Sequence, residues 1–148
     1  MTASDNLGYL LDADTLERIF RANPFAVRRL SLTPEEQVWV SSITAEEMLS
    51  GALSQINKAR EQKVRQDVEA PSRYFSRLIE RLRFFNILAY TNAAEQEYDT
   101  YSTATKRIGK MDCRLAAHAT ANNFVIVTCN TADFSRIPNA RNEDWSKE

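Results

Sequence analysis

The 148-residue sequence contains little glycine, proline, cysteine or histidine. Three glycines and four prolines are too few for a fibrous or loop-rich chain. The two cysteines, Cys113 and Cys129, lack the spacing of a metal site or disulfide framework, and a single histidine, His118, excludes a Cys/His zinc centre. No apolar run approaches the roughly 18 residues of a membrane span, and the N-terminus has no signal core. We therefore expect a cytosolic globular protein.

Neither sign of charge dominates, because 19 basic residues face 20 acidic ones and leave a formal net charge of −1. This balance does not indicate a nucleic-acid-binding protein, although a nuclease can combine an acidic pocket with local basic patches. The sequence also lacks a phosphate-binding glycine loop and a recognisable setting for a covalent nucleophile. Its length fits a single domain, residues 1–148, with a substantial core.

Hydrophobic segments of strand character alternate with segments of helical periodicity. Strands are expected over 8–12, 35–43, 86–90 and 124–128, with an extended piece near 139–145. Helices are expected over 15–22, 24–32, from Ala45 onward to a break near 69–72 at Pro71, and then over 73–85, 92–109 and 112–123. This alternation is typical of an α/β fold with a parallel sheet.

Four acidic residues stand where hydrophobic segments end or begin: Asp12, Glu47, Asp112 and Asp133. The carboxyl ends of parallel strands face one crevice, so carboxylates spread over the chain can meet at one sheet edge. Such a cluster needs a partner charge or shared protons, and Mg²⁺ prefers carboxylates, waters and phosphate as ligands. The pattern therefore predicts a metal-dependent phosphodiester hydrolase.

Each acid also has a structural interpretation. Asp12 can be the N-cap of the following helix, as can Asp14, and Thr44 with Glu47 fits a capping box. Asp112 at a helix start is favoured by the helix dipole, and Asp133 fits an Asx turn. The case for a metal site therefore depends on the joint position of the acids.

Other polar residues have competing interpretations. His118, among alanines, is better explained as a packed, hydrogen-bonded histidine than as a base. Basic residues that flank Asp112 in sequence are the better candidates for holding phosphates beside the acids: Lys106, Arg107, Lys110 and Arg114. Two basic runs are either solvated faces or an RNA-binding ridge: Lys58, Arg60, Lys63 and Arg65, and then Arg73, Arg77, Arg81 and Arg83.

Four segments together resemble the PIN-domain ribonucleases, specifically the VapC-type toxins of bacterial toxin–antitoxin pairs. These are YLLDADTL (9–16), SSITAEEMLSGA (41–52), IGKMDCRLAAHA (108–119) and FVIVTCNTADFSRIPNARNEDW (124–145). The run from Asp112 to Trp145 is the most specific, since it keeps the family's order of acid, helix, hydrophobic strand, Thr-x-Asn, acid-Phe, Arg-Ile-Pro and Asp-Trp. Residues 57–85 match only in helical character.

The resemblance implies a three-layer α/β/α fold with a central, mostly parallel sheet of four to five strands. It also implies Mg²⁺- or Mn²⁺-dependent endonucleolytic cleavage of RNA, possible substrates including tRNA. Asp12, Glu47 and Asp112 match the family's first three acids, as ligands or, for one of them, general base. Asp133 matches a more variable fourth acid, and Thr128 and Asn130 match a polar turn near the metal. Glu46 competes with Glu47, but the spacing to Gly51 favours Glu47.

The resemblance further implies a homodimer and a cognate VapB-like antitoxin whose C-terminal segment covers the acidic crevice. One departure stands out, since Asp12-Ala13-Asp14 replaces the family's usual Asp-Thr-Asn. The added Asp14 carboxylate changes the surroundings that orient the metal ligands.

Three alternatives remain open on the sequence. Asp12-Ala13-Asp14 after a hydrophobic strand is similar to the Asp-x-Asp pair of haloacid-dehalogenase-like phosphatases, with Asp12 as nucleophile, although Thr15 follows too closely. A receiver-like phospho-acceptor domain is less favoured because the strand expected at 86–90 lacks a terminal aspartate. The third is a PIN-like fold that only binds proteins.

Overall fold

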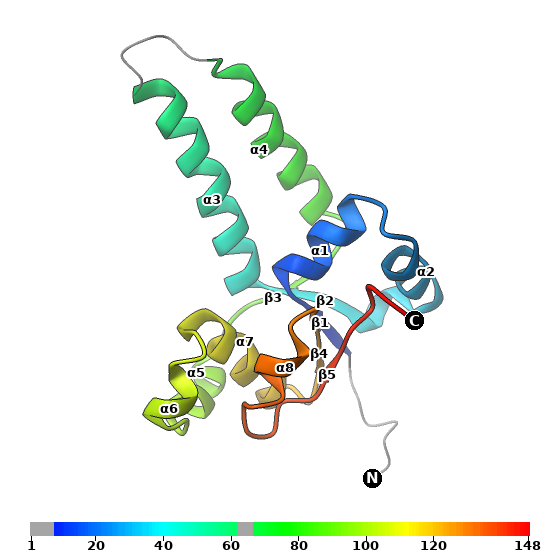
Figure 1. The fold of residues 1–148 in the computed structure, drawn as a ribbon, viewed down its shortest axis with the longest axis vertical. Helices are drawn as coiled ribbons and strands as arrows, with labels where there is room; N and C mark the ends of the chain where they lie inside the picture. The colour runs from blue at the N-terminus through cyan, green and yellow to red at the C-terminus, as the bar shows by residue number, and fades with distance from the viewer. Residues whose placement is uncertain (1–7, 62–66) are drawn as a thin grey trace.

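A computed structural model describes residues 8–61 and 67–148. Within these residues, five strands form one parallel sheet in the order β3-β2-β1-β4-β5 (Figure 1). The strands are β1 (Tyr9–Leu11), β2 (Val38–Ser41), β3 (Asn86–Leu88), β4 (Val125–Val127) and β5 (Asn142–Glu143). Each lies inside a segment expected to be extended, and the predicted parallel sheet is confirmed.

The order of the strands creates a switch point beside β1. The chain adds β2 and β3 on one side of β1, and then places β4 and β5 on the other side. Leu11 pairs in register with Val40 of β2 and Val127 of β4, so the three central strands end at the same level. In parallel sheets, ligands bind in the crevice outside the strand ends at such a point.

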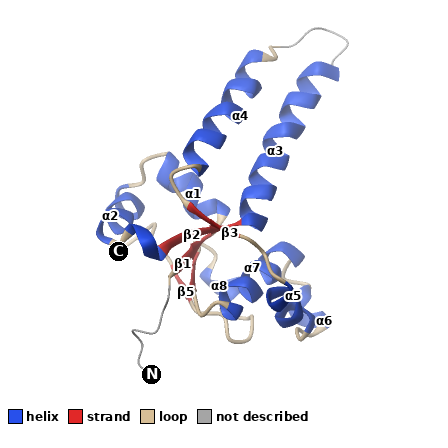
Figure 2. Ribbon diagram, turned by 180° about the vertical axis from the view of Figure 1, so that it is seen from behind, coloured by secondary structure: helices blue, strands red, loops and turns tan. Residues whose placement is uncertain are grey.

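Helices cover both faces of the sheet, which confirms the three-layer α/β/α architecture (Figures 1 and 2). One layer comprises α1 (Ala13–Phe20), α2 (Pro24–Leu32), α3 (Ser42–Glu61) and α4 (Glu69–Leu82). The other comprises α5 (Asn92–Asp99), α6 (Thr103–Lys106), α7 (Lys110–Ala121) and α8 (Thr131–Phe134). The outer parts of α3 and α4 extend side by side away from the sheet (Figures 1 and 2).

The alternation of side chains along the strands divides the apolar core between the two faces. Leu10 and Ile126 belong to the cluster that packs against α5 and α7. Leu11 and Val127 belong to the cluster beneath α1 to α4, which Trp145 near the C-terminus joins. All five of these side chains are buried. In the described part of the chain, no helix combines the length and the apolar character needed to cross a membrane.

Two predicted boundaries around β2 and α4 are wrong. The segment 35–43 begins as a 3-10 turn at Glu35–Gln37, and α3 starts at Ser42, because the Ser41 hydroxyl accepts the Ile43 N–H (3.1 Å) at the helix start. The break predicted at 69–72 lies earlier, since α4 begins at Glu69. Pro71 occupies its first turn, where a missing N–H leaves no helical bond unmade. Lys63 and Arg65 lie outside the described residues.

The single helix predicted over 92–109 is divided in two. Helix α5 ends at Asp99, and Ser102 caps a new short helix by accepting the Thr105 N–H at 3.1 Å. A serine that offers its own hydrogen bond to the backbone competes with helix continuation. Helix α7 then begins at Lys110, two residues earlier than predicted, and the loop expected after β4 contains α8.

Candidate metal centre

Four carboxylates line one pocket at the ends of β1 and β2. The pocket has a volume of about 130 Å³, and its acidic members are Asp12, Asp14, Glu47 and Asp112. They come from the β1–α1 junction, from α3 and from α7. The structure thus brings together three of the four acids selected from the sequence, and adds Asp14 from the same turn as Asp12.

Asp12 is both a helix cap and a wall of the pocket. Its Oδ1 accepts the Thr15 N–H at 2.8 Å, which confirms the capping interpretation. Its backbone N–H donates to Val127 O at 3.0 Å and so continues the β1–β4 pairing. Burial raises the pKa of Asp12, while hydrogen bonds from Thr128 and Thr15 oppose that rise. Capping therefore fixes this carboxylate at the strand end without removing it from the pocket.

Asp112 lies in the first turn of α7, facing the other acids. Burial raises its pKa to about 6, and the charges of Asp12, Glu47, Asp133 and Asp14 contribute further. Like charges that share a site disfavour ionisation, and a cation placed among them reverses that effect. Burial is thus the main cause of the raised pKa, and the neighbouring carboxylates add to it.

The start of α7 depends on Gly109, which has a φ of +148°. This backbone conformation is strained for residues with a side chain. Gly109 O accepts the Cys113 N–H at 2.9 Å and so begins the helix that carries Asp112. The sequence marked Gly109 only as a helix end.

Glu47 does not form the predicted capping box. Because α3 begins at Ser42, Glu47 lies in the second turn of the helix, and Thr44 is a buried helical residue rather than the N-cap. The Glu47 side chain is instead exposed to the acidic pocket. Glu46 does not line this pocket.

Asp133 lies beyond the pocket lining, on α8, but is close enough for its charge to raise the pKa of Asp112. Asn130 Nδ2 donates to its Oδ2 at 2.8 Å, and Arg136 approaches it at 3.8 Å. Thr128 is fully buried, and its hydroxyl accepts the Asn130 N–H at 2.9 Å. Thr128 and Asn130 therefore connect Asp12 and Asp133 through one hydrogen-bonded turn.

His118 is a packed histidine, as predicted. Its ring is fully buried, with Nε2 3.1 Å from Ala89 O and Nδ1 2.9 Å from Ser41 Oγ. A carbonyl only accepts, so in a neutral ring Nε2 carries the proton and Nδ1 accepts the Ser41 hydroxyl. This contact joins the end of β2, from which α3 begins, to α7. It was not predicted, because Ser41 and His118 are 77 residues apart.

The basic residues beside Asp112 do not line the acidic pocket. Arg114 donates from Nε and Nη2 to the two Glu95 oxygens at 3.1 and 3.0 Å. Lys106 lies over the Tyr98 ring, 4.5 Å from its centroid, while Lys110 is exposed at the first residue of α7. The proposed phosphate role of Arg114 therefore requires it to leave Glu95.

The acidic pocket suits a hard, hydrated cation. Among residues 8–61 and 67–148, no three acidic, histidine or cysteine side chains lie together in an arrangement that could hold a metal ion. Mg²⁺ does not need three, because it retains several waters and binds through one or two carboxylates. The oxygen donors of Asp12, Glu47 and Asp112 are the kind that such an ion prefers, and a bound cation would favour the charged form of Asp112 that burial disfavours.

Sequence comparisons agree with this geometry. The PIN domain family model matches residues 9–140. The chain is 28% identical over 145 residues to ribonuclease VapC1 of Haemophilus influenzae (strain R2866), covering 94% of this chain and 98% of the relative. It is 26% identical over 144 residues to the tRNA(fMet)-specific endonuclease VapC of Shigella flexneri, covering 95% and 99%.

Solved structures show the same fold. The DNA-bound VapBC complex from Salmonella typhimurium contains a chain that matches with a TM-score of 0.71 at 27% identity, covering 94% of this chain and 98% of that one. VapBC-1 from nontypeable Haemophilus influenzae matches with a TM-score of 0.67 at 28% identity and the same coverage. The strand order, the acidic switch point and these matches lead to one conclusion: the chain belongs to the PIN domain family.

Proposed function

We propose that this protein is a Mg²⁺- or Mn²⁺-dependent endoribonuclease and the toxin of a toxin–antitoxin pair. The observation that carries the proposal is the meeting of Asp12, Glu47 and Asp112 at the switch point of the sheet, where Asp112 has a pKa of about 6. The relatives are named ribonucleases and endonucleases and cover nearly the whole chain, which supports the same activity here.

Asp12, Glu47 and Asp112 would hold the cation, and Asp133 would act from outside this set. When bound, the cation supplies a water of lowered pKa and neutralises charge on the phosphate. Such a water would be the nucleophile for hydrolysis, in which a bond from phosphorus to the water oxygen replaces the bond to the leaving ribose oxygen and that oxygen takes up a proton. Thr15 and Thr128 keep the Asp12 carboxylate oriented. Asp112 would hold the ion as a carboxylate, so its raised pKa would make ion binding depend on pH.

The proposed substrate and partners are based on what these relatives are named for. One relative is named as specific for tRNA(fMet), so we propose a structured RNA such as tRNA as the substrate. Two of the solved relatives are toxin–antitoxin complexes named VapBC, which supports a VapB-like antitoxin for this chain. A homodimer is proposed on the same family basis. The phosphatase alternative based on Asp12 gains no support from any of these matches.

The neighbouring residues Glu46 and Glu47 provide a matched test. Only Glu47 lines the acidic pocket, although both are exposed residues of α3. We expect chelated wild-type protein to cleave tRNA only after Mn²⁺ or Mg²⁺ is restored. Glu47→Gln should lose cleavage, and Glu46→Gln should retain it. Equal activity in the two variants, or cleavage in the presence of excess chelator, would contradict the proposal, and no cleavage by the wild type would favour a protein-binding PIN module.

A further inference from the structure

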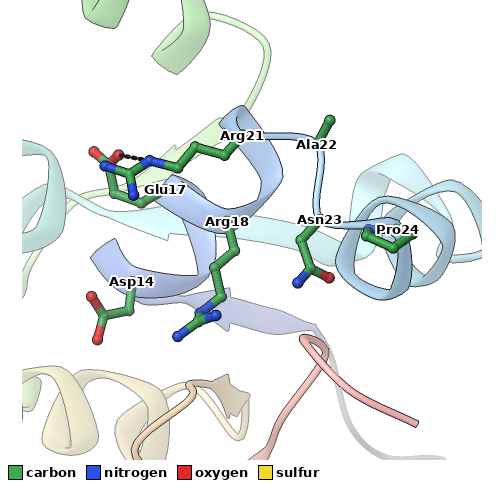
Figure 3. Close-up of a pocket in the computed structure, with 7 residues that line it drawn as sticks. All are labelled: Asp14, Glu17, Arg18, Arg21, Ala22, Asn23 and Pro24. Atoms are coloured by element: carbon green, nitrogen blue, oxygen red, sulfur yellow. Dashed lines mark ion pairs between the residues drawn. The ribbon is translucent and has the colours of Figure 1, made fainter.

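A second, larger pocket adjoins the acidic one along α1. It has a volume of about 430 Å³ and lies between α1 and the start of α2 (Figure 3). Its polar lining residues are Asp14, Glu17, Arg18, Arg21 and Asn23. Asp14 lines both pockets, so the two hollows are neighbours on the protein surface.

Most polar groups of this pocket already have partners. Glu17 accepts a hydrogen bond from Tyr74 at 3.2 Å and pairs with Arg21 at 4.0 Å. Asn23 caps α2 by accepting the Ala26 N–H at 3.0 Å. Figure 3 shows that Asp14 and Arg18 project from one side of α1, away from the Glu17–Arg21 pair.

Among the described residues, Arg18 and Asp14 are the two polar lining groups without such a partner. Asp14 and Arg18 have the i,i+4 spacing and the order that favour an ion pair on a helix. Yet within residues 8–61 and 67–148 the exposed Arg18 guanidinium has no carboxylate within 4.0 Å and no hydrogen-bond acceptor. Five donors in a planar fork are therefore available in the pocket that shares Asp14 with the acidic one.

An RNA strand bound across the acidic pocket needs such a cation nearby. The phosphates that flank the scissile one would meet carboxylates unless basic groups bind them. Two other guanidinium groups near the acids have acidic partners, since Arg114 is paired with Glu95 and Arg136 lies 3.8 Å from Asp133. Arg18 is unpaired and lines a hollow large enough to admit part of a nucleotide.

We propose that the α1–α2 pocket is a subsite for the RNA backbone and that Arg18 binds a phosphate next to the scissile one. This inference rests on the proposed ribonuclease function and adds a residue that positions the substrate. Arg18 suits this role because a guanidinium can form two parallel hydrogen bonds to phosphate oxygens. A protein partner is the competing occupant, and it predicts no dependence of RNA affinity on Arg18.

Salt dependence tests the contact directly. A fluorescein-labelled single-stranded RNA would be titrated with protein carrying Asp112→Asn, so that the RNA is not consumed, and affinity would be measured by anisotropy at several salt concentrations. Each phosphate contact to single-stranded RNA contributes a slope of about −0.7 in log affinity against log salt. Adding Arg18→Ala should reduce the slope by about 0.7 and weaken binding several-fold. Arg18→Lys should preserve the slope, because it keeps the charge.

Arg28→Ala is the matched control, since Arg28 is exposed on α2 and does not line the pocket. Its slope should equal that of the parent. An unchanged slope in Arg18→Ala, or the same change in Arg28→Ala, overturns the assignment. Cleavage by wild-type protein is measured separately. If the wild type cleaves RNA but Arg18→Ala leaves the salt slope unchanged, only the proposed subsite is rejected. If Arg18→Ala changes the slope but the wild type does not cleave, the nuclease function is rejected and the RNA contact is retained.

Discussion

Asp112 and Arg114 lie two residues apart on α7, yet their surroundings are opposite. Asp112 is half-buried among carboxylates, and its pKa is raised to about 6. Arg114 is held by both oxygens of Glu95 and lies 4.3 Å from the centroid of the Tyr98 ring. A hydrogen bond from Arg114, and then one from Tyr90, keeps the pKa of Glu95 low. Asp112 thus faces like charges, whereas Arg114 is paired with an opposite charge and an aromatic ring.

The contrast separates charges that support the fold from charges kept for a ligand. The Glu95–Arg114 pair joins α5 to α7, which pack extensively against each other, so its charges are neutralised within the protein. Among the described residues, no basic side chain lies within 4.0 Å of Asp12, Glu47 or Asp112, and carboxylates that share a site disfavour one another's charged form. An arrangement that disfavours its own charged state is a candidate functional site. Substitutions at Asp112 and Asp14 change the acidic side of this contrast, and a substitution at Arg114 changes the paired side.

The largest expected effect is that of Asp112→Asn on RNA cleavage. Loss of a proposed metal ligand should reduce kcat/KM by more than about 100-fold, because even groups one step removed from a metal cost 10–100-fold. The variant should be as stable as wild type or more so, since it removes repulsion. Cleavage assays and thermal unfolding measure the two effects, with exposed Asp99→Asn as the control. Near-normal cleavage would contradict the assignment.

The second prediction concerns pH. The pKa of Asp112 is higher in the folded chain than the ordinary value of 3.8, so the folded state binds more protons between about pH 4 and pH 6. This contribution to stability is fully present below the unfolded pKa and is lost as pH rises through 6. Metal-free protein should therefore unfold at a higher denaturant concentration at pH 5 than at pH 7.

Asp112→Asn should weaken that pH dependence, and Mn²⁺ affinity of the wild type should fall as pH decreases from 7 to 5 because protons compete with the ion. Stability that rises from pH 5 to pH 7 equally in both proteins would show that Asp112 is not the group concerned.

Arg114→Ala should have a smaller effect of a different kind. The pair it breaks is partly exposed, with 31% and 37% of the two side chains accessible, so the expected loss is about 1 kcal/mol of unfolding free energy, including the contact with Tyr98. Mn²⁺ affinity should not change. Denaturant titration and calorimetry report the two quantities. A large fall in Mn²⁺ affinity would mean that Arg114 serves the acidic pocket after all.

Asp14→Asn should have the smallest effect. Asp14 is exposed and contributes the last of the four charge effects that raise the pKa of Asp112. Removing its charge should lower that pKa slightly and change Mn²⁺ affinity by only a few-fold. The pH dependence of Mn²⁺ binding in the two proteins measures both. Complete loss of binding would instead make Asp14 a principal ligand.

Much of the fold is predictable because β1, β2 and β4 are short apolar runs, as is typical of strands buried in a parallel sheet. The adjacency of β1 and β4 is not visible locally, since more than 100 residues separate Leu11 from Val127. The acids were selected because they follow or precede such runs, although each has a local alternative. The capping interpretation is confirmed for Asp12, whose side chain accepts the Thr15 N–H. It is wrong for Glu47, because α3 begins at Ser42 and not after Thr44.

Contacts between distant polar residues were beyond prediction. The Ser41–His118 hydrogen bond and the Glu95–Arg114 pair depend on how helices α5 and α7 pack on the sheet. The periodicity of a helix indicates which of its faces is apolar, but it does not indicate which polar group elsewhere in the chain its polar side chains will contact. Arg18 was overlooked for the same reason, because its pocket forms only where α1 turns into α2.

The central claim is that the carboxylates at the switch point bind a divalent cation. Isothermal titration of Mn²⁺ at pH 7 into wild-type protein, Asp112→Asn and the control Asp99→Asn tests it most directly. We predict saturable binding to the wild type and the control, and its loss in Asp112→Asn. The absence of binding to wild-type protein, or equal binding to all three, would contradict it.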